Sequence, residues 1–158
     1  MKKVIIYLIL TIGSTAIGVL THKYFLDFSF SLLNKRNVTL VASSVGIQFK
    51  NHLFFIVSMG IFPLLYLISE KFTRPKSPRR IMTNLALILG TGIVCWLLKI
   101  FQLNNLFKKL SAFNIAFGVQ NTMDIQNLNF GKYLFIGLLI GTLLSILIFR
   151  KKNTLVEE

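Results

Sequence analysis

Four long apolar runs divide the chain, and each is bounded by charged or polar residues. The runs lie near Val4–Leu20, His52–Ser69, Ile81–Phe101 and Lys132–Phe149. At about 1.5 Å of rise per residue, a helix of such a length crosses a hydrocarbon core about 30 Å thick. The pattern therefore predicts an all-α integral membrane protein with four transmembrane helices, in a single membrane domain over residues 1–158.

The first apolar run has some features of a signal peptide, because Lys2 and Lys3 precede it. Small residues follow its centre from Gly13 to Ala16, but the apolar character continues through Leu20 without a clear small-x-small cleavage site. We therefore expect a retained helix.

Two segments between the runs, 21–51 and 102–131, are too apolar to be solvated linkers. The stretch NVTLVASSVGIQF is β-branched and predicts short strands on the membrane face. The stretch LFKKLSAFNIAF places apolar residues near helical spacing and predicts an interfacial amphipathic helix; its stripe is Leu106, Leu110, Phe113 and Phe117. We expect a small extracytoplasmic β-rich cradle there, and a substrate-binding role and simple packing over the bundle both stay open.

Positive charge sets the expected orientation. The chain has a net charge of +13, and ten of its eighteen Lys and Arg residues fall in three clusters beside the apolar runs, at residues 2–3, 71–80 and 150–152. The positive-inside rule then predicts that both termini are cytoplasmic, and Pro75 and Pro78 predict a short non-helical connection in the middle cluster. No basic stretch is interleaved with aromatic residues in a polar context, so nucleic-acid binding is not expected.

Few residues are available for chemistry on the extracytoplasmic side. Of the five acids, only Asp27 and Asp124 lie there in this orientation. Hydrolysis by paired carboxylates needs one ionised and one protonated acid held close together. Two solvated loop aspartates are the simpler interpretation.

Three other arrangements point to specific chemistry only weakly. His22 and His52 lie at the extracytoplasmic ends of the first two runs, without the close spacing of a metal site. A serine, Ser43 or Ser44, would need a desolvated Lys132 to form a catalytic dyad. The single Cys95 allows neither a disulfide nor a cysteine-ligated zinc site within this chain. We expect no metal and no cofactor.

The middle of the chain carries a resemblance to a known family. NVTLVASSVGIQFKNHLFFIVSMGIFPLLYLI looks like the strand and second helix of signal peptidase II, the lipoprotein signal peptidase, whose strand reads Asn-Thr-Gly-Ala-Ala-Phe-Gly. Gly46 and Phe49 fit that motif, whereas Ser44 stands at the asparagine and Lys50 at the last glycine. The family has four spans, cytoplasmic termini, a β-rich cradle and an aspartate dyad at the outer ends of its third and fourth helices.

The third and fourth runs are similar to the two helices that carry the dyad. SPRRIMTNLALILGTGIVCWLLKIF resembles Gly-Gly-Ala-x-Gly-Asn-x-x-Asp-Arg. Gly90 keeps the first glycine and Lys99 the cation, while Cys95 replaces the asparagine and Leu98 the first catalytic aspartate. In LNFGKYLFIG, Lys132 replaces the second catalytic aspartate. A leucine and a lysine cannot share a proton as two carboxyls do, so the resemblance implies that the aspartyl mechanism is lost.

Three further positions keep family residues. GVLTHK resembles Asp-Gln-x-Thr-Lys and keeps Thr21, LNFGKYLFIG keeps Asn129, and TMDI corresponds to Val-Val-Asp-Phe and keeps Asp124. The stretch FSFSLLNKRNVTLVASSVGI resembles the start of large-conductance mechanosensitive channels. This second resemblance ends with that stretch, and those channels have two spans, whereas four are predicted here.

These patterns predict a non-catalytic signal-peptidase-II-like protein whose groove binds an apolar helix, either a lipoprotein signal sequence or the transmembrane segment of a partner. It would lie in the cytoplasmic (inner) membrane of a bacterium, surrounded by lipids. The resemblance implies these groove residues: Thr21, Ser44, Gly46, Phe49, Cys95, Lys99, Asp124 and Asn129.

Two alternatives belong to other functional classes. The first is a small structural subunit of a larger membrane complex, and the second is an active lipoprotein signal peptidase with altered catalytic residues. Close helix packing is compatible with both the helix-binding function and the structural subunit, and six glycines on the faces of the spans would allow it: Gly13, Gly60, Gly90, Gly92, Gly137 and Gly141.

Overall fold

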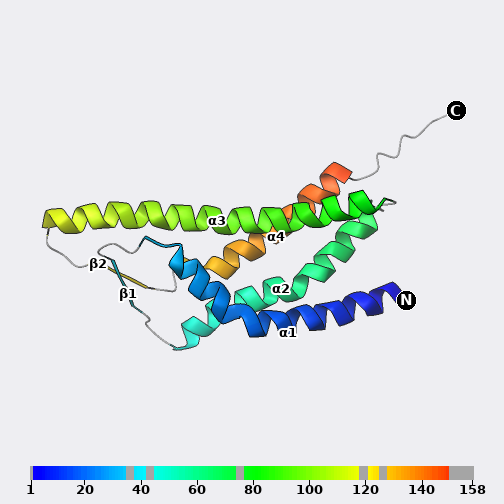
Figure 1. Ribbon diagram of the computed structural model, residues 1–158, viewed down its shortest axis with the longest axis horizontal. Helices are drawn as coiled ribbons and strands as arrows, with labels where there is room; N and C mark the ends of the chain where they lie inside the picture. The colour runs from blue at the N-terminus through cyan, green and yellow to red at the C-terminus, as the bar shows by residue number, and fades with distance from the viewer. Residues whose placement is uncertain are drawn as a thin grey trace.

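The computed structural model describes residues 2–34, 38–41, 45–73, 77–117, 121–124 and 128–149. Their secondary structure is four helices and two short strands (Figure 1): α1 Lys2–Ser31, β1 Val38–Val41, α2 Val45–Thr73, α3 Pro78–Phe117, β2 Asn121–Asp124 and α4 Phe130–Phe149. Each helix is long and apolar enough to cross a membrane, which indicates a multi-pass membrane protein.

Two helices run well past the ends predicted for them. α1 continues to Ser31 rather than ending near Leu20, and α3 continues to Phe117 rather than ending near Phe101. Neither extension contains a glycine or a proline that would stop a helix. The predicted separate amphipathic helix is therefore the last part of α3.

The packed face of that last part differs in part from the predicted stripe. Leu103 and Phe107 are buried and continue the spacing of Trp96 and Ile100, whereas Leu106 of the stripe is 40% exposed. Leu110 of the stripe packs against the same buried cluster, and the side chains of Phe113 and Phe117 lie outside the described ones. Residues three and four apart share one face of a helix, so the buried stripe of α3 runs unbroken from its membrane-spanning part into its extension.

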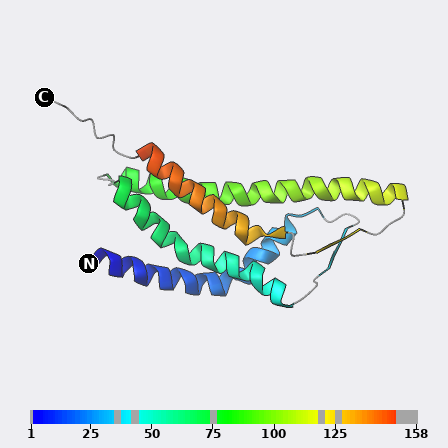
Figure 2. The ribbon, with the colours of Figure 1, turned by 180° about the vertical axis from the view of Figure 1, so that it is seen from behind.

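The helices pack in the order α1, α2, α4, α3. The start of α1, the end of α4 and the neighbouring ends of α2 and α3 lie at one end of the molecule, and the strands lie at the other (Figures 1 and 2). We call these the terminal end and the strand end. α1 bends, and its last turns leave α2 and approach α3 (Figure 2).

Glycines set the closest helix contacts. A Cβ atom at Gly137 of α4 would lie 2.7 Å from the Cα of Gly92 and 2.7 Å from the carbonyl oxygen of Thr91 on α3. Only glycine fits such an approach, as in other membrane helix pairs. Of the six glycines predicted to lie on packing faces, Gly13 and Gly90 have no such neighbour within 4 Å.

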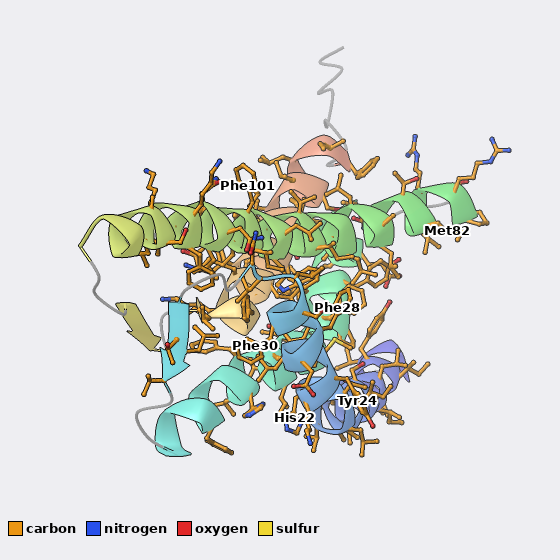
Figure 3. The ribbon with its side chains drawn as sticks, turned by 60° about the vertical axis from the view of Figure 1, so that its left-hand side comes forward. His22, Tyr24, Phe28, Phe30, Met82 and Phe101 are labelled. Atoms are coloured by element: carbon orange, nitrogen blue, oxygen red, sulfur yellow. The ribbon has the colours of Figure 1, made fainter. Side chains whose placement is uncertain are left out.

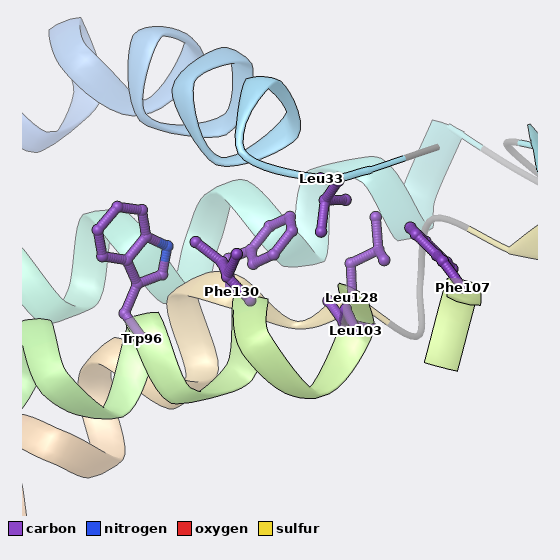
Figure 4. Packing of buried hydrophobic residues seen from close by; sticks show 7 residues of the cluster. Leu33, Trp96, Leu103, Phe107, Leu128 and Phe130 are labelled. Carbon is purple, nitrogen blue, oxygen red and sulfur yellow. The ribbon is translucent and has the colours of Figure 1, made fainter. Parts of the chain in front are cut away.

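The larger apolar cluster lies near the strand end, between the end of α1, α3 and the start of α4 (Figure 4). Its members are Leu33, Trp96, Ile100, Leu103, Phe107, Leu128 and Phe130. A second cluster of Leu65, Tyr66, Ile88 and Leu138 lies nearer the terminal end.

Three buried polar side chains join α2, α3 and α4 near the terminal end. The Asn84 amide nitrogen donates to the Ser69 hydroxyl at 2.9 Å, and the hydroxyls of Ser69 and Ser145 lie 2.8 Å apart. Ser145 also donates to the Asn84 carbonyl oxygen. Each group is therefore satisfied within the cluster, which we call the polar knot.

β1 and β2 pair in parallel, with Val38 opposite Asn121 and Val41 opposite Asp124. This one pair is the β structure within the described residues. β1 falls inside the stretch predicted to form strands, whereas residues 45–49 of the same stretch are the beginning of α2, so the strand prediction is wrong for them.

Candidate functional site

Cations and histidines lie on the helices where the apolar bundle ends on the side of the strands. Lys3 and His22 of α1 lie nineteen positions apart, as do His52 and Lys71 of α2 and Arg80 and Lys99 of α3. Nineteen positions of α-helix span about 29 Å, which matches a hydrocarbon core of about 30 Å. We call the strand-end set the collar, which comprises His22, Lys23, His52, Lys99 and Lys132.

Lys99 is the central residue of the collar. It is the one charged residue of α3 between Arg80 and Lys108, and it is half-buried. Its Nζ lies 4.8 Å from the centroid of the Tyr133 ring on α4, within the range of a cation–π contact. Lys132, the chain neighbour of Tyr133, is exposed.

The turn before α4 positions Tyr133. Asn129 has a φ of 48°, in the left-handed region that asparagine adopts more readily than most residues. Its carbonyl oxygen accepts the Tyr133 backbone N–H at 3.2 Å. Asn129, predicted as a groove residue, thus starts the helix that carries the partner of Lys99.

Leu98 and Lys132, the two residues that stand in place of the catalytic aspartates of the family, are both exposed. Leu98 is 54% exposed, and Lys132 also faces outward. The contact described here between α3 and α4 instead joins Lys99 to Tyr133. Lys99 directly follows Leu98, and Tyr133 directly follows Lys132. One residue turns a helical side chain by about 100°, so the positions that meet hold a cation and a phenol.

Three other predicted groove residues have described surroundings, and they lie on three different helices. Cys95 is half-buried at the α3–α4 contact, beside Gly137. The Thr21 hydroxyl donates to the carbonyl of Ile17 in its own helix, at 2.8 Å. Phe49 is 65% exposed.

The remaining groove residues belong to the β-rich cradle of the prediction. Gly46 lies in the first turn of α2. Asp124 ends β2, with its side chain outside the described residues, and Ser44 also lies outside them.

The two histidines meet across α1 and α2. The ring centroids of His22 and His52 are 4.5 Å apart with the planes nearly perpendicular. Nδ1 of His22 contacts the Val19 carbonyl, and Nδ1 of His52 is buried without a hydrogen-bond partner. The described residues contain no group of three His, Cys, Asp or Glu side chains placed to hold a metal.

Trp96 and Ser29 fasten the end of α1 to α3, and sequence reasoning missed both. The Trp96 Nε1–H donates to the Ser29 hydroxyl at 3.1 Å. Phe25 stacks on Phe55 with centroids 4.2 Å apart, and Phe28 lies against Trp96 at 5.9 Å. The signal available in the sequence was the Trp96, Ile100, Leu103 spacing, which predicts one buried face.

Asn104 makes a second fastening, which was also missed. Its Oδ1 accepts the backbone N–H of Asn34 at 2.8 Å, and its Nδ2 donates to the carbonyl of Leu32 at 3.1 Å. One side chain on the α3 extension therefore fixes the chain between α1 and β1, just beyond the collar.

Comparison of the chain with protein-family models, with curated proteins and with solved structures finds no match.

Proposed function

We propose that the chain is a non-catalytic membrane protein of signal-peptidase-II-like design that binds an apolar helix. The observation that carries the non-catalytic part is the Lys99–Tyr133 contact, at the level where that family holds two proton-sharing acids. A lysine ammonium has donors and no acceptor, so it cannot act as the base that activates water.

The free face of α1 supports the binding part. Only 6% of the residues in the apolar window of α1 are buried, against 39% in α2. One side of α1 packs on α2 through Tyr7, Thr15 and Gly18. The opposite side is an exposed stripe at helical spacing: Ile5, Ile9, Ile12 and Leu20.

Small residues interrupt this exposed stripe. Gly13 has no side-chain neighbour within 4 Å, and Ala16 is exposed beside it. Small residues let a second helix approach closely inside a membrane, where packing rather than water exclusion drives association. An apolar helix, either a lipoprotein signal sequence or a partner's transmembrane segment, therefore has a matching surface on α1.

A cross-linking experiment tests both parts of the proposal. The protein carrying a photoreactive phenylalanine at Ile12 would be reconstituted in nanodiscs with a lipid-modified lipoprotein precursor. We expect a cross-linked, intact precursor, and a much weaker product from the exposed control position Leu143 on α4. Cleavage at the modified cysteine would contradict the non-catalytic assignment, and equal cross-linking at both positions would contradict the α1 surface.

We also propose that the terminal end is cytoplasmic and the strand end extracytoplasmic, in a bacterial inner membrane, with the strand pair as part of a small cradle. The positive-inside rule supports this orientation, because ten of the eighteen Lys and Arg residues fall in the sequence clusters at 2–3, 71–80 and 150–152, beside the apolar runs. With Cys95 replaced by serine, a cysteine at Asn105 should react with an impermeant thiol reagent from outside, and one at Ser77 should not.

A structural subunit is the second candidate function. α3 extends about 27 Å past Lys99, and this extension exposes Phe101 and Leu106, which suits contact with a larger partner. Co-purification at fixed stoichiometry with specific subunits, lost on Phe101→Ser, would favour it.

An enzyme that uses Asp124 with Asp27 or Lys132 is the third candidate, and full activity of an Asp124→Asn variant would remove it.

A further inference from the structure

Among the described side chains, cations outnumber acids at the strand end. At the strand end, the described charged side chains are the cations Lys23, Lys99, Lys108, Lys109 and Lys132 and the single acid Asp27. No ion pair joins Lys99 to a described acid, and its ammonium group instead lies against the Tyr133 ring. A lysine near the end of a membrane-spanning helix extends its ammonium group to the interface, where lipid headgroups lie.

Apolar surface adjoins these cations. Leu98 and Phe101, which flank Lys99 on α3, are 54% and 64% exposed. A ligand that contacts this surface therefore meets an ammonium group beside an apolar wall. An amphiphile with an anionic head and a hydrocarbon tail can contact both the ammonium group and the apolar surface, whereas a nucleic acid or an acidic peptide matches only the charge.

Exposed aromatic residues place the collar at headgroup depth. Tyr24 and Phe28 on α1 and Phe101 on α3 are exposed beside the collar (Figure 3), while Met82 lies toward the terminal end of α3. Aromatic side chains gather at the boundary between hydrocarbon and headgroups. The lysines beside them therefore lie within reach of lipid phosphates.

We propose that the collar binds anionic phospholipid headgroups of the leaflet at the strand end, with Lys99 and Lys132 holding one headgroup phosphate. The Tyr133 ring lies against the Lys99 ammonium group, and Lys132 is exposed at the preceding position of α4. The phosphate contacts proposed for Lys99 and Lys132 lie on α3 and α4 and do not depend on the helix-binding stripe proposed for α1.

Photo-cross-linking with lipid of defined headgroup tests the inference. The wild-type protein in phosphatidylcholine nanodiscs would receive a small fraction of photoactivatable phosphatidylglycerol, and attachment sites would be mapped by mass spectrometry. We expect attachment near residues 97–101 and 130–134. Each of Lys99→Gln and Lys132→Gln should lower it about five-fold, Lys99→Arg should retain it, and Arg80→Gln, nineteen positions away on α3, should leave it unchanged.

Three results would overturn the inference. One is unchanged attachment in the Lys99→Gln, Lys132→Gln double variant, whose folding is checked through the emission of the buried Trp96. Another is equal attachment of photoactivatable phosphatidylcholine, which would show that the collar does not read the headgroup charge. The third is loss of attachment in excess inorganic phosphate at matched ionic strength, which would identify a free-phosphate site instead.

Discussion

The two ends of the helix bundle treat their polar groups differently. In the polar knot, Asn84, Ser69 and Ser145 are buried and hydrogen-bond to one another. In the collar, Lys99 is half-buried against the Tyr133 ring, and Nδ1 of His52 has no hydrogen-bond partner. Buried polar groups that are satisfied internally stabilise one packing, whereas unsatisfied groups at a boundary are available to a ligand. The polar knot therefore holds the helices together at the terminal end, whereas the collar is a surface on which a ligand can bind.

The largest expected effect comes from separating α3 and α4 between the two ends. Gly137→Leu places a side chain where a Cβ atom would already lie 2.7 Å from the Cα of Gly92. Because backbone atoms must move, we expect the free energy of unfolding to fall by about 3 kcal/mol. Unfolding in a denaturing detergent, followed through the emission of the single tryptophan, would measure it.

Gly90→Leu is the matched control for this substitution. Nothing lies within 4 Å of a Cβ atom at Gly90, although it is two residues from Gly92 on α3. Its effect should stay within about 0.5 kcal/mol. Equal losses from both variants would show that α3 and α4 are not held by the glycine contact.

The next largest effect tests the polar knot. Asn84→Leu removes the amide that bonds both serines and should lower the free energy of unfolding by about 2 kcal/mol. Asn105→Leu, at an exposed position of the same helix, should change it little. Wild-type stability of Asn84→Leu would mean that the terminal end does not depend on these hydrogen bonds.

A smaller effect is expected where α1 is fastened beside the collar. Trp96→Phe keeps most of the ring but loses the 3.1 Å bond to Ser29, which should cost about 1 kcal/mol. A double-mutant cycle with Ser29→Ala should return a coupling of similar size, measured by circular dichroism. Ser31→Ala, whose hydroxyl bonds its own helix, serves as the uncoupled control, and additive effects at Trp96 and Ser29 would contradict the fastening.

The sequence predicted the helices well and their ends poorly. Apolar runs locate membrane spans because hydrocarbon requires about twenty apolar residues. The same rule does not detect a helix that continues beyond its apolar run, as α1 does to Ser31 and α3 does to Phe117. The absence of glycine and proline after Gly92 in α3 was the available signal.

The candidate site was harder to predict, because its contacts join distant parts of the chain. Trp96 and Ser29 are 67 positions apart, and His22 meets His52 from another helix. A register shift of one residue also separates Leu98 and Lys132 from the contact between Lys99 and Tyr133. One residue turns a helical side chain by about 100°, so a sequence pattern alone does not determine which of two neighbouring positions contacts another helix.

The smallest expected change in stability is at the collar itself, and it separates the two ends most clearly. Lys99→Gln loses a half-exposed cation–π contact, worth about 0.5 kcal/mol of unfolding free energy, while attachment of phosphatidylglycerol should fall about five-fold. Asn84→Leu should show the reverse, with lower stability and unchanged lipid attachment per folded molecule. If Lys99→Gln instead destabilised the protein as much as Asn84→Leu, Lys99 would be a packing residue, and the collar would be a second fastening rather than a surface for lipid.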